Sequence, residues 1–249
     1  MKLQEHFSRA GEFLFRWRGH LPLLLLPLVL LSFRDFGYPE GSPRLYRVWE
    51  FVCFGVSMMG VALRVWVSGT VPEGTSGRNR RGQRADSLNT SGAYSVLRHP
   101  LYFGNTLIAL GVALFTRTWY LPVIVLLSCL LFYERIAFRE EEFLEGKFGE
   151  EFRGWAERTP AVLPNLKVYR PPSLPFSWRS ALRREFYTIS EVVLAFSVLD
   201  ILGRLSAEGR VRTDPLWGAL GSAAVVFYLS LMFLKKRTAV LDVNPQARR

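Results

Sequence analysis

The feature that most constrains the fold is an uncharged apolar run near the C-terminus, LWGALGSAAVVFYLSLMFL (Leu216–Leu234). It is 19 residues long and is followed at once by Lys235, Lys236 and Arg237. A helix of about 20 residues crosses the hydrocarbon core of a bilayer, and the lipid offers the backbone no other hydrogen-bond partners. The run therefore predicts a transmembrane helix with its basic end at the membrane surface.

Five further apolar segments are candidates for membrane helices. They are Leu21–Phe33, Tyr46–Ser68, Leu101–Phe115, Trp119–Tyr133 and Ile189–Gly203. The first and the last are short, and the second contains three charged residues, Arg47, Glu50 and Arg64. Only three residues separate the third from the fourth, which predicts a tight helical hairpin. The predicted fold class is therefore all-α, an integral membrane helical bundle with about six transmembrane helices.

The basic residues are unevenly distributed between the two sides that these helices define. With both termini inside, 24 of the 32 Lys and Arg residues fall in inside segments and 6 in outside loops. The inside segments are 1–20, 69–100, 135–188 and 235–249, and the outside loops are 34–45, 116–118 and 204–215. Because cytosolic loops carry the excess of Lys and Arg, the sequence predicts both termini in the cytosol. We expect a multi-pass protein of a bacterial inner membrane.

The composition limits the classes of function. A net charge of +11 is typical of nucleic-acid binders, but 49% of the residues are apolar and form long uncharged runs. Attraction to anionic lipids explains the charge better, so no nucleic-acid partner is predicted. Cys53 and Cys129 lie inside apolar runs, and His6, His20 and His99 are far apart. No metal site is therefore predicted.

Two segments between the predicted spans carry unusual patterns. Residues 68–92 are polar, basic and rich in glycine, which predicts either a flexible loop at the lipid headgroups or a lid over a neighbouring site. Within 134–166, the side chains of Phe148, Phe152 and Trp155 fall on one helical face. That pattern predicts an amphipathic helix lying in the membrane interface.

The most informative stretch is YSVLRHPLYFGN, at the start of the third apolar segment. Pro100 suits the first turn of a helix, so the helix is expected to start at about His99, where its amides favour an anion. His99, Tyr102 and Asn105 follow at intervals of three residues, and we expect them to share a face. Gly104 leaves room for a ligand or another helix. An interfacial anchor, with Arg98 and the Tyr at the headgroups, is the alternative.

An acidic cluster follows where the fourth apolar segment leaves the membrane. It consists of Glu134, Arg135, Arg139, Glu140, Glu141 and Glu142. Because the hairpin brings this end beside His99, the carboxylates and the helix start together suit a zwitterionic ligand, with Arg98 near the ligand's carboxylate. A solvated charged collar is the alternative interpretation.

These residues resemble a known family. SGAYSVLRHPLYFGN, then a hairpin and REEEFLEGKFGEEFRGWAERTPAVLP, is similar to the isoprenylcysteine carboxyl methyltransferase and phospholipid methyltransferase superfamily, over about Gly92–Pro164. The resemblance implies a cytosolic-side pocket for S-adenosylmethionine between the RHP helix and the E-E pair. Together with Arg98 and Asn105 from the same stretch, the motif positions give the expected cofactor-binding set: Tyr94, Arg98, His99, Pro100, Tyr102, Gly104, Asn105, Glu140 and Glu141.

The resemblance also implies roles and a division of the chain. Arg139 or Arg135 would orient an acceptor carboxylate, and Glu140 would accept a proton from an acceptor amine. Ile136 stands where the prenylcysteine enzymes carry an Arg, which argues against a prenylcysteine acceptor. We expect N-terminal membrane helices in 1–70, a methyltransferase core in 71–170 and a C-terminal helix pair in 171–249.

The predicted function is S-adenosylmethionine-dependent methylation of a lipidic or amphiphilic acceptor at the cytosolic membrane face. Either a carboxylate oxygen or an amine nitrogen would receive the methyl group, and the sequence favours neither. The expected partners are this acceptor and the membrane lipids. A membrane reductase that uses NADPH and a non-catalytic membrane scaffold remain as alternatives.

Overall fold

The computed structural model describes residues 3–17, 19, 21–34, 36–72, 75 and 85–242, and these residues form helices joined by irregular connections. They contain no strand, only an isolated antiparallel bridge between Gly92 and Arg170. Four of the helices are long and apolar enough to cross a membrane: α3 (Pro43–Thr70), α6 (Tyr120–Phe148), α8 (Trp178–Glu208) and α9 (Pro215–Arg237). The predicted all-α membrane bundle is thus confirmed.

The two remaining predicted spans are shorter than a membrane helix. Helix α5 (Pro100–Phe115) has 16 residues, or about 24 Å at 1.5 Å per residue. The first apolar segment divides into a 3-10 turn, η1 (Leu21–Leu25), and the seven-residue helix α2 (Leu26–Ser32). Pro27 lies in the first turn of α2 and has no N–H to continue a preceding α-helix, so the break follows from the sequence. Four long helices and two short ones therefore replace the expected six spans.

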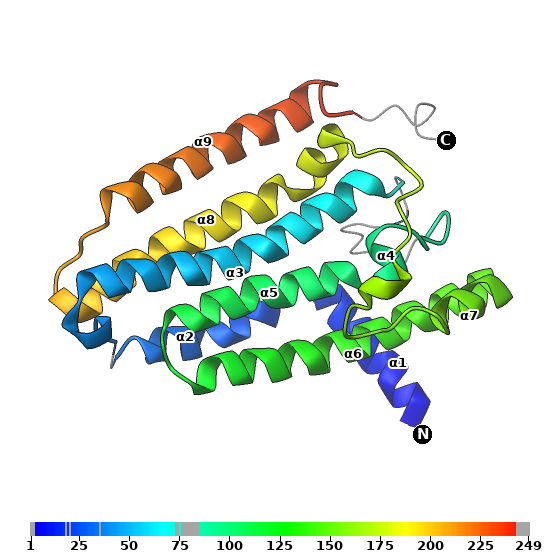
Figure 1. Ribbon diagram of the computed structural model, residues 1–249, viewed down its shortest axis with the longest axis horizontal. Helices are drawn as coiled ribbons and strands as arrows, with labels where there is room; N and C mark the ends of the chain where they lie inside the picture. Colours follow the sequence, from blue (N-terminus) through cyan, green and yellow to red (C-terminus); the bar gives the residue numbers. More distant parts are fainter. Residues whose placement is uncertain are drawn as a thin grey trace.

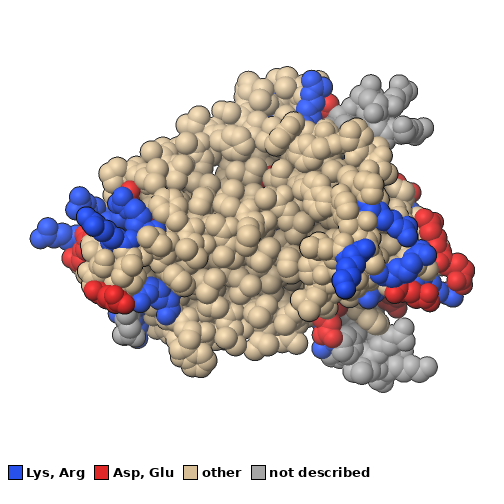
Figure 2. Space-filling model, viewed as in Figure 1, with Lys and Arg blue, Asp and Glu red and all other residues tan. Residues whose placement is uncertain are grey.

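The other elements are short or lie at the ends of the bundle. They are α1 (Leu3–Trp17), η2 (Pro39–Gly41), α4 (Ala93–Val96), α7 (Glu150–Ala156) and η3 (Leu166–Val168). Figure 1 shows α9, α8, α3, α5 and α6 side by side in this order, with α1 crossing α6 and with α4 and α7 at one end of the bundle. Figure 2 shows the charged side chains gathered at the two ends of the visible face, with an almost uncharged band between them. That band is the surface expected to face lipid.

Helices α3 and α5 approach each other through glycines. A Cβ added at Gly111 would lie 2.8 Å from the backbone nitrogen of Ser57, and one at Gly104 would lie 3.0 Å from the carbonyl oxygen of Gly60. Small residues let helix backbones approach closely in membranes, where packing and hydrogen bonds replace the hydrophobic effect as the cause of helix association. This contact fixes α5 against the centre of the bundle.

A buried ion pair joins α3, α5 and α8 beside this contact. Arg64 on α3 donates to Glu185 on α8 from Nε at 2.9 Å and from Nη2 at 3.1 Å, and it donates from Nη1 to Oδ1 of Asn105 on α5 at 2.6 Å. Ser68 donates to the same carboxylate at 2.7 Å. Because the two charges are paired and hydrogen-bonded, they are tolerated inside a membrane bundle.

The predicted interfacial helix packs into the protein instead. Helix α6 continues to Phe148, and Gly149, with a φ of +53°, separates it from α7. Phe152 and Trp155 on α7 are only 4% and 6% exposed, and the indole nitrogen of Trp155 donates to the carbonyl oxygen of Tyr94 at 3.0 Å. The apolar face was correctly identified, but protein and not lipid covers it.

Some of the sequence predictions fall on residues that lie outside the described ones. These are most of the basic loop, at 73–74 and 76–84, and the ends of the chain, at 1–2 and 243–249. The possible role of this loop as a lid therefore stays a prediction.

The glycine contact makes a specific prediction about stability. Gly111→Ala is expected to destabilise the bundle by about 1–3 kcal/mol, because the added methyl group overlaps the backbone of α3. Gly55→Ala is the matched control, since no atom lies within 4 Å of a Cβ at this position; it is expected to be neutral or stabilising by up to about 1 kcal/mol. Thermal unfolding of both variants in detergent measures the difference, and equal melting temperatures would contradict the proposed packing.

Candidate functional site

The candidate site begins at the N-terminus of α5. His99 occupies the position before the helix and Pro100 its first turn, as the sequence predicts. The backbone of this stretch is held from outside the hairpin, because the amide of Arg98 donates to the carbonyl oxygen of Pro160 at 2.9 Å. No side chain caps the start of α5, so its end keeps the partial positive charge that favours an anion.

The carboxylates of α6 meet this helix start. Nε2 of His99 lies 2.8 Å from Oε1 of Glu141, and its Nδ1 lies 3.5 Å from Oε2 of Glu140. Arg98 donates from Nη1 to Oε2 of Glu141 at 2.6 Å. The predicted antiparallel hairpin therefore does bring the Arg-His pair and the two glutamates together.

The carboxylates of Glu140 and Glu141 determine the protonation state of His99. An imidazole between two carboxylates satisfies both only when each ring nitrogen carries a proton. Burial of the side chain, which is 10% exposed, opposes the charged form. The hydrogen bonds to Glu140 and Glu141 and the charges of both carboxylates outweigh this effect and raise the pKa of His99 to about 9. His99 is thus a cation at neutral pH.

Two aromatic rings extend the cluster along the seam between α5 and α6. Tyr102 donates from its hydroxyl to Oε1 of Glu140 at 2.6 Å. Its ring stacks on His99 at a centroid distance of 5.6 Å and on Tyr133 at 4.6 Å. The sequence interpretation did not single out Tyr133. A signal was present, because Tyr133 precedes Glu140 by two helical turns and therefore shares its face.

Three of the predicted site residues contact other parts of the protein. Asn105 accepts from Arg64 on α3, so it does not share the face of His99; six residues correspond to a rotation of 600°, which leaves the two side chains about 120° apart. Gly104 also faces α3. Tyr94 contributes its carbonyl oxygen to the indole of Trp155.

The two predicted acceptor-orienting residues lie towards α1. A Cβ added at Gly11 of α1 would overlap the carbonyl oxygen of Arg135 and lie 2.9 Å from Cβ of Arg139. Arg139 donates to Glu142 at 2.7 Å, and Arg135 lies 3.6 Å from a carboxylate oxygen of Glu134. The arginine that does contact the His99 cluster is Arg98, through its hydrogen bond to Glu141.

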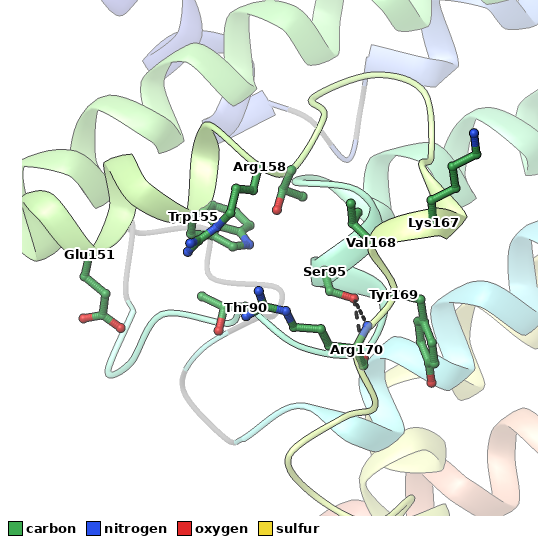
Figure 3. Close-up of a pocket in the computed structure, with 10 residues that line it drawn as sticks. Thr90, Ser95, Glu151, Trp155, Arg158, Lys167, Val168, Tyr169 and Arg170 are labelled. Carbon is green, nitrogen blue, oxygen red and sulfur yellow. Dashed lines mark hydrogen bonds between the residues drawn. The ribbon is translucent and has the colours of Figure 1, made fainter.

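A cavity of about 640 Å³ lies beside the chain segment that precedes His99, and none of the cluster residues is among those that line it. Its lining residues come from the stretch before α4, from α4, from α7 and from the segment that follows α7 (Figure 3). They are Thr90, Ser95, Glu151, Trp155, Arg158, Thr159, Lys167, Val168, Tyr169 and Arg170. The sequence interpretation missed this cavity, although the basic residues after α7 were a visible signal.

The bundle and the cluster define the class of protein, an integral membrane helical protein with a polar site between the two arms of a helical hairpin. The model of the phospholipid methyltransferase family matches residues 51–151, which hold both arms. This match confirms the family resemblance that the motif indicates.

Two curated relatives are similar to this chain. The cobalt-zinc-cadmium resistance protein CzcN of Cupriavidus metallidurans is 35% identical over 132 residues, which cover 51% of this chain and 61% of that protein. The nickel-cobalt-cadmium resistance protein NccN of Alcaligenes xylosoxydans xylosoxydans is 36% identical over 92 residues, or 37% of this chain and 43% of that protein. The matches thus span less than two thirds of either relative. No solved structure matches the chain.

The names of both relatives mention resistance to metal ions. In the part of the chain that the structure describes, no group of three or more His, Cys, Asp and Glu residues is arranged to hold a metal ion.

The position of His99 predicts how stability depends on pH. Its pKa in the folded protein, about 9, is above the ordinary value of about 6.5. The ion pairs therefore stabilise the fold fully below about pH 6.5, and this contribution is lost as the pH rises through about 9. We expect the melting temperature of the wild type to fall more steeply between about pH 7 and 9.5 than that of His99→Gln, which lacks the titrating group. Parallel curves would contradict the assigned protonation.

Proposed function

We propose that this protein transfers a methyl group from S-adenosylmethionine to a lipidic or amphiphilic acceptor at the membrane surface. The observation that carries the proposal is the cluster of Arg98, His99, Tyr102, Glu140 and Glu141, which lies inside the segment that matches the phospholipid methyltransferase family. The family match alone supports the class of reaction, and the cluster supplies a place for the cofactor.

The residues present fit the cofactor's amino-acid end. Nε of Arg98 is buried and has no hydrogen-bond partner among the described residues, and Arg98 directly precedes the uncapped start of α5. A carboxylate would satisfy this N–H and the helix end together. Glu140 and Glu141 offer acceptors to an ammonium group. A zwitterion therefore matches the charges on both sides of the cluster.

When bound, S-adenosylmethionine supplies a methyl group on a positively charged sulphur, ready for in-line displacement. The residues of this chain bind and orient the reactants and keep water out. Glu140 is placed to accept the proton of an acceptor amine, while an acceptor carboxylate is already anionic and needs only a cation to orient it. Because Arg135 and Arg139 lie towards α1, we assign them this role for an acceptor that approaches along α1 and α6.

The names of the two relatives report resistance to metal ions and name no reaction. The direct test is therefore incubation of membranes that contain this protein with methyl-labelled S-adenosylmethionine, followed by mass analysis of the lipids. A labelled lipid that requires the intact chain is the expected result. Binding of NADPH, without binding of S-adenosylhomocysteine, would favour the membrane reductase, and binding of neither would favour the scaffold.

The cofactor site makes a prediction about four variants. His99→Ala and Glu141→Gln are each expected to weaken binding of S-adenosylhomocysteine by about 1–3 kcal/mol, the usual cost of losing one partner of a charged hydrogen bond. The double variant should lose less than the sum, because the two residues contact each other. Glu145→Gln is the control, since Glu145 pairs with Arg153 away from the cluster. Titrations in detergent measure all four, and wild-type affinity in both single variants would refute the site.

The proposed function also places the site on the cytosolic side, where S-adenosylmethionine is available. The excess of Lys and Arg on that side predicts that the chain end after Arg249 is cytosolic. A green fluorescent protein fused there is expected to fluoresce, and an alkaline phosphatase fusion at the same position is expected to be inactive. The reverse pattern would place the cluster on the wrong side for the cofactor.

A further inference from the structure

The cavity beside α4 has an unbalanced set of charges. Arg158, Lys167 and Arg170 line it together with the single carboxylate of Glu151. None of the three basic side chains has an ion-pair or hydrogen-bond partner among the described residues. A concave surface with unpaired cations favours an anion, and more strongly than a flat surface does.

The two arginines are directed towards one part of this cavity. Figure 3 shows the side chain of Arg158 running alongside Trp155, and that of Arg170 extending to Thr90, on the side of the cavity where this ring lies. Lys167 points away from them on the opposite side of the view, and the carboxylate of Glu151 lies apart on α7. The guanidinium groups of Arg158 and Arg170 therefore define the candidate anion site.

The backbone around these arginines is held in place. The amide of Arg170 donates to Oγ of Ser95 and its carbonyl oxygen accepts from the amide of Gly92, each at 2.9 Å. The residue next to Arg158, Thr159, is only 4% exposed and also lines the cavity. Because these bonds use the backbone of Arg170, its side chain is free to bind a ligand without unfolding the segment.

Exposed apolar side chains lie on the segment after α7 that lines part of the cavity. Tyr169, which lines it, is 49% exposed, and Leu163 and Leu166 on the same segment are 74% and 78% exposed. Exposed aromatic and aliphatic side chains interleaved with Lys and Arg are typical of segments that lie at a membrane interface. An anion in the cavity would thus lie at the depth of the lipid headgroups.

We propose that this cavity binds a phosphate ester, with the guanidinium groups of Arg158 and Arg170 as its ligands and the hydroxyl group of Thr90 beside them. Guanidinium groups match the oxygens of phosphate with two parallel hydrogen bonds each, and the hydroxyl group of Thr90 adds a further donor. The phosphate belongs either to an anionic lipid or to a soluble phosphate ester, and the exposed apolar side chains of the segment after α7 favour the lipid. The site is separate from the His99 cluster and does not depend on the proposed methyl transfer.

The test measures binding to the purified full chain without S-adenosylmethionine. Glycerol 1-phosphate is titrated against protein in an uncharged detergent, and phosphatidic acid is offered in phosphatidylcholine nanodiscs, with retained lipid identified by native mass spectrometry. Saturable binding of the soluble ester supports the site with a soluble source, and retention of phosphatidic acid alone supports it with a lipid source. Absence of both would overturn the proposal and leave the methyltransferase proposal untouched.

Matched variants distinguish the cavity from general attraction to an anionic surface. Arg158→Gln and Arg170→Gln are expected to weaken binding at least about tenfold, while Lys167→Gln, which removes the same charge from a side chain that points away, should weaken it less than about twofold. Arg170→Lys, with melting temperature as the check on folding, should bind between the wild type and Arg170→Gln. Equal losses in the Arg and Lys variants would indicate surface charge alone and refute the cavity.

Discussion

The close contact between α3 and α5 is the constraint on which the candidate site depends. Glycines on both helices let the backbones meet, and the hydrogen bond from Arg64 to Asn105 fixes the rotation of α5 about its axis. With that rotation set, the side chains of His99 and Tyr102 are directed to α6 and its carboxylates. A different rotation would move the cluster off the seam of the hairpin. The glycines of α5 thus influence the site indirectly, because they allow the close packing against α3 that orients His99 and Tyr102.

The charged residues inside the spans take part in the same constraint. In the sequence, Arg64 only interrupts an apolar run, and its cost in a membrane would be several kcal/mol if it were alone. In the structure it is paired with Glu185 and hydrogen-bonded to α5. Such a pair adds little net stability over an apolar contact, but removing one partner leaves an unpaired buried charge. The ion pair instead contributes specificity, because its hydrogen bonds form only when α3, α5 and α8 are arranged as they are here.

The sequence predicts well those features that depend on neighbouring residues or on the direction in which the chain must return after a short connection. Uncharged length predicts α9, Pro100 predicts the start of α5, and the short connection predicts that Glu141 returns to His99. The Leu-rich first segment shows the limit, because its hydropathy is high while Pro27 prevents a helix of spanning length. An apolar composition shows that a segment prefers lipid to water, but the segment spans the membrane only if its backbone can form one continuous helix of sufficient length.

Other features depend on contacts between distant residues, which no local pattern encodes. An amphipathic pattern gives α7 an apolar face, but it does not predict that the backbone carbonyl oxygen of Tyr94 accepts a hydrogen bond from the indole of Trp155. Similarly, the spacing suggested that His99 and Asn105 share one face of the helix. In the structure, the side chain of Asn105 instead accepts a hydrogen bond from Arg64 on the neighbouring helix α3. The basic cavity is missed for the same reason, since Thr90 and Arg170 are remote in the chain.

The residues beyond the family match are needed to complete the candidate site. The match ends at residue 151, yet the amide of Arg98 is held by the carbonyl oxygen of Pro160, and that of Asn165 by the carbonyl oxygen of Val96. The segment after α7 therefore runs alongside α4 and holds the backbone that presents Arg98 and His99. Because Ser95 and Arg170 line the basic cavity and Arg98 and His99 belong to the cluster, the hydrogen bonds between these two segments help to position both sites. A hairpin cut at the end of the match would retain the glutamates and lose the support of the residues that face them.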